Sequence, residues 1–222
     1  MAFEIKKSSD KKGKKLNILI HSDGALSKLD LVKTLPSDKV IVLNTEDGML
    51  SLSDEAFDYV DLKNLAEVKM FLKEINDKYE YIVLDTVTEL SQTRYTELKA
   101  KYPDEKQALK IWGDFLNDFS GLFRTLRKAN KHVIVNAHTC VKDFRKDGIE
   151  KNCPNISGKS SQRIVDWFDE VLYLFVDKDD KPMFLTQETD RTVAKDRSEK
   201  LEKLEPANLN EVFNKILGTK KA

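Results

Sequence analysis

The clearest chemical signal lies at residues 22–29, the segment SDGALSKL, which follows a short apolar run. A phosphate-binding loop of the pattern GxxxxGK[ST] joins a strand to a helix, so that backbone N–H groups and a lysine face the phosphates. Lys28 stands where the lysine of that pattern belongs, but Ser22 and Ser27 replace its two glycines. Leu29 replaces the hydroxyl residue that ligates Mg²⁺. The segment by itself fits either a degenerate phosphate-binding loop or an ordinary strand–turn–helix connection.

Two carboxylates also follow apolar runs. Asp85 ends the run YIVLD, and an acidic residue at the tip of a buried strand beside a phosphate loop orders Mg²⁺ and its water ligands. Glu46 follows the run KVIVLN, where a carboxylate could orient or deprotonate an attacking water. The alternative for Glu46 is a turn or a helix cap, and an apolar run that ends in Asp occurs in many α/β proteins.

Three other side chains are candidates for contacts with phosphate. His138 follows the run KHVIVN and could detect a terminal phosphate, although a single histidine is often structural. Lys195 and Arg197 are one residue apart in a strand-like segment, so their side chains are expected on one side of it. They could reach the nucleotide of a neighbouring subunit, as an arginine finger does, or they could be a surface charge pair.

Residues 139–156 lack strong periodicity and are expected to form a loop. Cations beside an aromatic ring suit single-stranded nucleic acid, because cations meet phosphates and the ring stacks on a base. The candidates here are Lys142, Phe144, Arg145 and Lys146. Acidic residues in the same stretch dilute the positive charge, so a plain solvated loop is the alternative. The basic tract at residues 6–15 could also bind DNA, or it could be a solubilising tail.

Alternating apolar runs and segments of helical periodicity predict an α/β fold with a mostly parallel central sheet flanked by helices. The expected strands are residues 16–21, 39–44, 80–85, 131–136, 170–176 and 182–186. The expected helices are residues 25–35, 65–78, 87–101, 106–128 and 209–217, with Gly218 ending the last one. No linker divides the chain, so we expect one domain over residues 16–222 after a basic N-terminal segment at residues 1–15.

Composition narrows the possible partners. Of the 222 residues, 38 are Lys or Arg and 38 are Asp or Glu, so no global charge favours nucleic acid or a membrane surface. No apolar run approaches the ~20 residues of a membrane span, and no signal peptide is recognisable. Cys140 and Cys153 are expected to be reduced thiols of a cytoplasmic protein, with neither a zinc site nor a disulfide.

The order of these signals resembles phage-encoded RecA-like P-loop ATPases of the AAA family, which accompany single-strand-annealing recombination systems. The matching segments cover most of the chain and are FEIKK, NILI, VLNTEDG, YIVLDTVTEL, IWGDFLNDFSGLFRTLRKANKHVIVNAH, NISGKSSQRIVDWFDEVLYL, AKDRSEKL and NLNEVFNKIL. The resemblance implies ATP and Mg²⁺ as cofactors, single-stranded DNA as a partner, and a homo-oligomeric ring or filament.

The resemblance also implies roles for individual residues. Asp85 is expected to hold the metal, Glu46 to activate water and His138 to detect the phosphate. Lys195 and Arg197 resemble a finger pair that acts on a neighbouring subunit, and the loop after Asn136 resembles a DNA-contacting loop. The residues expected to contact the nucleotide are Asp23, Gly24, Ala25, Leu26, Ser27, Lys28, Leu29 and His138.

The chain departs from the family pattern at the phosphate-binding loop, where only Gly24 and Lys28 remain. We expect an ATP-binding protein of phage DNA recombination or replication, and whether it hydrolyses ATP is left open. The alternative is a nucleotide-free or hydrolysis-dead scaffold that binds DNA or a recombination partner. A third possibility, an unrelated α/β enzyme, has no support from a GxSxG, HExxH or GxGxxG motif.

Overall fold

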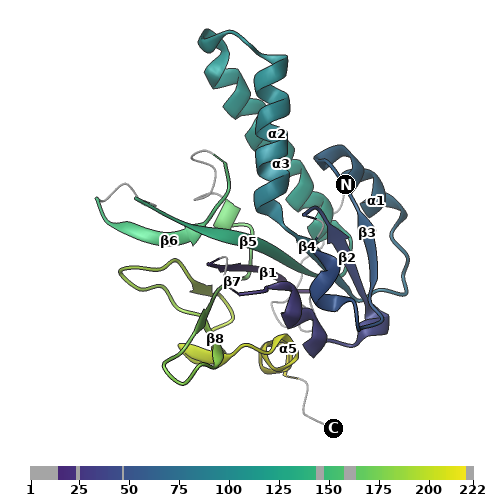
Figure 1. Ribbon diagram of the computed structural model, residues 1–222, viewed down its shortest axis with the longest axis vertical. Helices are drawn as coiled ribbons and strands as arrows, with labels where there is room; N and C mark the ends of the chain where they lie inside the picture. Colours follow the sequence, from purple (N-terminus) through teal and green to yellow (C-terminus); the bar gives the residue numbers. More distant parts are fainter. Residues whose placement is uncertain (1–14, 24–25, 47, 144–147, 158–163, 219–222) are drawn as a thin grey trace, which may run out of the picture.

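The computed structural model describes residues 15–23, 26–46, 48–143, 148–157 and 164–218. Within these ranges ten strands form one sheet, whose main path runs β10-β8-β7-β1-β5-β4-β2-β3 (Figure 1). The six strands from β7 to β3 along this path are mutually parallel. They are β7 (Glu170–Val176), β1 (Asn17–Ser22), β5 (His132–Asp143), β4 (Tyr81–Asp85), β2 (Val40–Asn44) and β3 (Asp58–Asp61).

Antiparallel strands are added to this sheet beside β7 and along the outer part of β5. Strand β8 (Pro182–Leu185) pairs with β7, and β10 (Leu204–Pro206) pairs with β8. Strand β9 (Lys195–Asp196) also pairs with β7, while β6 (Glu150–Pro154) pairs with the outer part of β5. The mostly parallel sheet that the sequence predicts is confirmed, and the antiparallel strands are additions to it.

Both faces of the sheet are buried by separate apolar clusters. On β1, Leu19 belongs to one cluster, whereas Ile18 and Ile20 belong to the other, because successive side chains of a strand point to opposite faces. The Leu19 face is covered by α1 (Leu65–Glu74), α2 (Val87–Lys101) and α3 (Ala108–Lys128). The opposite face is covered by the 3-10 helix η2 (Leu29–Thr34) and by α5 (Leu209–Leu217), and Figure 1 shows α5 across the sheet from α2 and α3.

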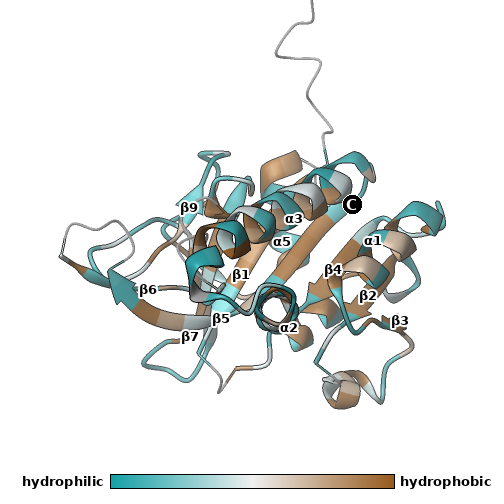
Figure 2. Ribbon diagram, turned by 90° about the horizontal axis from the view of Figure 1, so that it is seen from above, coloured by the Kyte–Doolittle hydropathy of each residue, from teal (hydrophilic) through white to brown (hydrophobic). Residues whose placement is uncertain are grey.

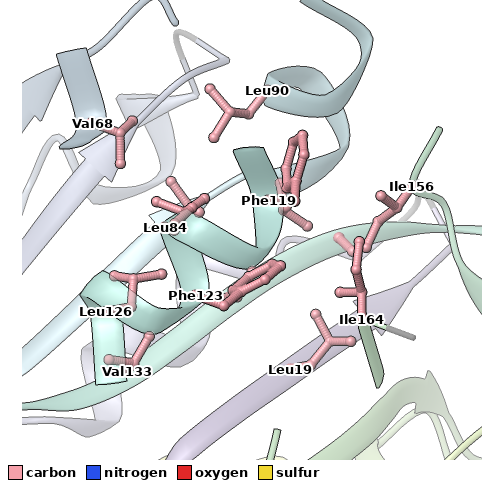
Figure 3. Close-up of a cluster of buried hydrophobic side chains, with 14 of the residues drawn as sticks. Leu19, Val68, Leu84, Leu90, Phe119, Phe123, Leu126, Val133, Ile156 and Ile164 are labelled. Atoms are coloured by element: carbon pink, nitrogen blue, oxygen red, sulfur yellow. The ribbon is translucent and has the colours of Figure 1, made fainter. Parts of the chain in front are cut away.

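Helix α3 corresponds to the helix predicted at residues 106–128 and carries a stripe of buried aromatic side chains. Figure 3 shows Phe119, Phe123 and Leu126 of this helix packed over the strand residues Leu84 and Val133. The hydropathy colouring of Figure 2 shows hydrophilic residues on the outward-facing side of this helix. Beyond the sheet, α2 and α3 continue as a projecting hairpin, so that Leu109 near its tip is 87% exposed (Figure 1).

Two expectations about secondary structure are wrong. The predicted helix at residues 25–35 is reduced to the short η2, and the chain is already extended at Leu35, as the following Pro36 favours. Within the predicted loop at residues 139–156, residues 139–143 of β5 and residues 150–154 of β6 pair as antiparallel strands. Backbone hydrogen bonds hold these strands together, and the buried positions of β6 include the charged Lys151, so apolar periodicity carries no signal for them.

The remaining elements are short. They are the 3-10 helices η3 (Ser37–Lys39), η4 (Met49–Leu52) and η5 (Glu105–Gln107). No helix in the described ranges combines the length and the apolarity that crossing a membrane requires.

Candidate functional site

Parallel pairing brings the ends of four strands to one edge of the sheet. Asn44 of β2 lies opposite Asp85 of β4, and Asp85 lies opposite Asn136 of β5. Ser22 of β1 lies opposite His138. The residues that follow these strand ends therefore meet at the carboxyl edge, where open α/β sheets bind their ligands.

Glu46 is the centre of a hydrogen-bond network at this edge. Its Oε1 accepts a hydrogen bond from Thr86 Oγ1 at 2.5 Å and lies 2.8 Å from His138 Nε2. Thr86 is the N-cap of α2, where its hydroxyl also accepts the backbone N–H of Glu89 at 3.3 Å. The start of α2 and the end of β5 thus hold the Glu46 carboxylate in one orientation.

The loop that carries Glu46 is also attached to β4 by its backbone. The N–H of Thr45 donates to the carbonyl of Asp85 at 2.7 Å, and the N–H of Thr86 donates to Thr45 Oγ1 at 2.8 Å. The side chain of Asn44 accepts the N–H of Gly48 at 3.3 Å. These bonds fix the distance between Glu46 and Asp85.

Asp85 is a buried carboxylate, only 5% exposed. Its Oδ1 accepts a hydrogen bond from Asn136 Nδ2 at 2.9 Å. Burial raises the pKa of Asp85, the hydrogen bond from Asn136 opposes this shift, and the nearby charge of Glu46 adds to it. Among the described residues, the buried Asn136 Oδ1 has no hydrogen-bond partner, so an acceptor oxygen is left over beside Asp85.

Lys28 brings positive charge to these carboxylates. Its side chain is 6% exposed, and its Nζ donates to Ser22 Oγ at 3.2 Å. Burial lowers the pKa of Lys28, while Asp85, Glu46 and Asp23 oppose that shift. Lys28 is therefore a buried cation at the edge of the sheet where Glu46 and Asp85 also lie, and its charge is favoured by these carboxylates.

The described part of the loop accounts for Ser27 and Leu29, which replace a glycine and the hydroxyl residue of the phosphate-binding pattern. Ser27 Oγ accepts the N–H of Asp30 at 3.3 Å, so this serine caps the first turn after the loop. Ser27 is not among the described residues with positive φ, so its Cβ brings no backbone strain. Leu29, the first residue of η2, is 4% exposed in the core, where it can offer a nucleotide only its backbone N–H. Gly24 and Ala25 lie outside the described residues.

Asp23 and Leu26 complete the described loop. Asp23 Oδ2 accepts a hydrogen bond from Tyr173 OH at 3.1 Å, and the N–H of Leu26 donates to the Asp23 carbonyl at 3.3 Å. Burial, together with the charge of Asp23, raises the pKa of Tyr173 to about 12. Tyr173 therefore remains a neutral hydrogen-bond donor that restrains Asp23.

The donor set fits a hydrated metal ion better than one held tightly by protein. Magnesium keeps several of its waters and often binds through one or two carboxylates together with substrate phosphates. Asp85 provides such a carboxylate and Asn136 Oδ1 a free acceptor, whereas the buried side chain of Leu29 provides no oxygen. Within the described ranges, no group of three or more His, Cys, Asp or Glu residues is arranged to hold a metal by itself.

Lys195 and Arg197 lie at the opposite edge of the sheet. Lys195 pairs with Val171, near the start of β7, and its Nζ donates to the carbonyl of Val165 at 3.1 Å. Arg197 is the more exposed of the two, with a side chain 62% exposed and Nη1 3.7 Å from Asp169 Oδ1. The structure does not bring this pair to Lys28 and Glu46 of the same chain.

The predicted DNA-binding residues fall mostly outside the described ranges. Lys142 lies on β5, opposite Lys151 of β6, in the hairpin that continues from the site edge. Phe144, Arg145 and Lys146 belong to residues 144–147, which are not described.

Sequence reasoning missed three residues of the site. Asn136 and Thr45 gave no signal, because each acts through a neighbour that lies far away in the sequence. Thr86 did give one, since the order Thr-Val-Thr-Glu at residues 86–89 is a capping box. A helix that starts directly after Asp85 places its capping hydroxyl beside the strand end.

His21, the residue before the loop, was also missed. It is fully buried, with Nδ1 2.9 Å from Thr139 Oγ1 and Nε2 2.8 Å from the carbonyl of Val193. Nε2 must donate to that carbonyl, so Nδ1 accepts from the threonine and the ring is neutral. Burial lowers the pKa of His21 to about 4. His21 thus connects β1 to β5 without adding charge to the site.

Comparisons with known proteins agree with this fold. A family model described as an AAA domain matches residues 14–198. Among solved structures, the crystal structure of the RadB recombinase is similar, with a TM-score of 0.52 at 15% identity. The similarity covers 82% of this chain and 91% of that one, and it shows a shared RecA-like fold. A search of curated proteins found no match.

Proposed function

Because the chain belongs to the AAA-domain family, we propose that it binds ATP at the carboxyl edge of its sheet and acts in DNA recombination or replication. The observation that carries this proposal is the parallel register of β1, β5, β4 and β2, which brings the segments that carry Lys28, Glu46 and Asp85 to one edge of the sheet. RecA-like folds bind nucleotide with magnesium at this edge. An ordinary strand–turn–helix connection gives no reason to bury a lysine at this edge.

Each residue has a separate task in the proposed site. Lys28 donates to the β- and γ-phosphates, as the lysine of a phosphate-binding loop does. Asp85 would hold a magnesium ion through its carboxylate. The bound ion would neutralise the charge that develops on the phosphates. Glu46 orients the attacking water, and His138 holds Glu46 while lying where it can detect a terminal phosphate.

Lys28 would lose little free energy by giving up its present hydrogen bond. Within the described part of the chain, its Nζ donates to Ser22 Oγ, a neutral hydroxyl, at 3.2 Å. The present bond has one charged partner, whereas a bond from an ammonium to a phosphate has two, so a phosphate adds a Coulombic attraction that the hydroxyl lacks. Exchange of the hydroxyl for a phosphate is therefore favourable, and it keeps the lysine charge balanced by the magnesium-binding carboxylate.

We also propose single-stranded DNA as the partner and the β5–β6 hairpin as its contact. Support comes from the basic residues within and between these two strands and from the recombinase among the similar structures. A ring or filament would bring the exposed Arg197 of one subunit to the nucleotide of the next. Phage origin and a cytoplasmic location belong to the same proposal, since the resemblance to phage recombination ATPases implies both.

The proposal is tested by titrating ATP and Mg²⁺ into the protein in a calorimeter and by measuring phosphate release with and without single-stranded DNA. We expect saturable binding that Lys28→Met abolishes. Lys33→Met is the matched control, because Lys33 lies on η2 and pairs with Asp30 at the surface. No binding at millimolar ATP would refute nucleotide binding altogether.

The alternative is a scaffold that keeps the fold but does not hydrolyse ATP. The burial of Leu29 favours it, because the hydroxyl ligand of the metal is replaced by a core side chain. Two measurements distinguish these functions. The scaffold would bind single-stranded DNA with the same affinity in the presence and absence of ATP, and it would release no phosphate.

A further inference from the structure

The β5–β6 hairpin contains two cysteines that are 13 residues apart in the sequence and adjacent in space. Cys140 of β5 and Cys153 of β6 are directly opposite each other in the antiparallel register. Their Sγ atoms are 3.7 Å apart, and both are free thiols. The sequence predicts independent reduced thiols, and the hairpin that brings them together is not visible in it.

This position meets the geometric requirement of a disulfide. Opposed residues of an antiparallel pair have Cα atoms about 4.5–5.5 Å apart, within the range of about 4.4–6.8 Å that a disulfide spans. Closing the Sγ–Sγ distance therefore requires side-chain rotation and no change of strand register. From this geometry we infer that Cys140 and Cys153 form a reversible disulfide that cross-links the β5–β6 hairpin when the protein meets a peroxide.

The two thiols differ in a way that assigns their order of reaction. Cys153 is buried, whereas Cys140 is partly exposed and can be reached from solvent. The hydrogen bond from the Cys153 thiol lowers the pKa of Cys140, and the nearby Lys142 ammonium adds to this effect. The same hydrogen bond and burial raise the pKa of Cys153. Cys140 is therefore the attacking thiolate and Cys153 the resolving thiol.

The chemistry balances with hydrogen peroxide as the oxidant. The Cys140 thiolate attacks one peroxide oxygen, the O–O bond breaks, and a sulfenic acid and hydroxide result. The Cys153 sulfur then attacks the sulfenic sulfur, the S–S bond forms, and the sulfenic oxygen leaves as water. Two thiols and one peroxide give one disulfide and two waters, and a dithiol reductant reverses the change.

The cross-link acts where the β5–β6 hairpin joins the core, since Cys153 is fully buried there. Within the described residues, β6 pairs as a strand only with β5, and its other backbone contacts are to Arg191 and Val193. Thr139, the neighbour of Cys140, contacts His21 at the end of β1. A bond between the two strands would therefore restrict the hairpin where it leaves the site edge.

The experiment is intact-mass and peptide-mass spectrometry of the full chain after treatment with a slight excess of hydrogen peroxide. The expected product has lost two hydrogen atoms, contains a Cys140–Cys153 peptide and returns to the starting mass with dithiothreitol. Hydrogen exchange of the β5 and β6 amides is expected to slow at least tenfold in the oxidised protein. Cys140→Ser and Cys153→Ser are the controls, and neither is expected to give the intramolecular product.

Other products would overturn the inference. They are addition of one or more oxygens to the wild-type chain without loss of two hydrogens, or a disulfide only between two chains. Unchanged hydrogen exchange in a fully cross-linked protein would overturn the stiffening of the hairpin. Because the wild-type mass change is measured directly, the test does not depend on the folding of either serine variant.

Discussion

Glu46 and His138 are joined across the sheet, with Glu46 Oε1 2.8 Å from His138 Nε2, although their strands are separated by β4. The two residues are 92 positions apart in the chain. Their contact passes over the end of β4, which is where Asp85 and Thr86 lie. The candidate water-activating residue and the candidate phosphate detector are therefore one hydrogen-bonded unit.

This unit predicts the effect of removing the Glu46 charge. Glu46→Gln keeps the size of the side chain and can still accept from Thr86, but it cannot activate water. We expect at least 100-fold slower ATP hydrolysis with ATP affinity changed less than about threefold. Steady-state phosphate release and calorimetry measure the two quantities.

Glu55→Gln is the matched control for this substitution, because Glu55 is exposed in the same post-β2 segment. It should leave hydrolysis unchanged. Equal rates for wild type and Glu46→Gln would remove Glu46 from the mechanism.

The loop variant Ser27→Gly with Leu29→Thr is expected to hydrolyse ATP faster than the wild type and to be less stable. The introduced threonine would supply a hydroxyl to the metal, so hydrolysis should rise at least tenfold. Removing Leu29 from its buried position should lower the free energy of unfolding by about 1–3 kcal/mol. Urea unfolding and phosphate release test both halves.

Ser27→Gly alone is the control, since it removes the cap on Asp30 but leaves Leu29 in the core. If the double variant loses stability without gaining any hydrolysis, the missing hydroxyl is not what limits the site.

A pH-dependent stability is predicted at the other edge of the sheet. Burial raises the pKa of Glu170 from 4.5 to about 8, with the neighbouring Asp196 adding to the shift. Since the folded pKa lies above the unfolded one, this contribution is fully present below about pH 4.5 and is lost as pH rises through about 8. The free energy of unfolding should fall by up to about 1.4 kcal/mol per pH unit over that window.

Glu170→Gln should flatten this dependence, because the amide stays neutral and can still donate to Asp196. Thermal unfolding between pH 5.5 and 8.5 measures the slope, with the exposed Glu202→Gln as a control that keeps it. A wild-type slope that survives in Glu170→Gln would assign the effect to other groups.

The core of α3 predicts a large loss of stability from one substitution. Phe115 is completely buried between the helices and the sheet, so Phe115→Ala should cost about 3–5 kcal/mol of unfolding free energy. Leu109→Ala on the same helix should change it by less than about 0.5 kcal/mol, because Leu109 is exposed. Denaturant unfolding of both variants compares them, and similar losses would mean that α3 does not pack as described.

The sequence alone determined the pattern of strands and the stripe of α3. Continuous apolar runs such as NILI and YIVLD require burial on both faces, and a helix with aromatic residues at helical spacing requires a sheet to cover. The parallel arrangement of these strands then directs Lys28, Glu46, Asp85 and His138 to one edge. The strand segments and the buried face of α3 follow from local periodicity, because burial of apolar surface decides which residues must face the core.

Only the tertiary structure decided which of these side chains touch and which neighbours hold them. The pairing of Glu46 with His138, the burial of Leu29 and the opposition of Cys140 and Cys153 depend on strand order and register. Periodicity records which face a residue lies on, but it carries no information about the partner on another strand. Contacts between residues far apart in the chain are fixed only when the sheet is assembled.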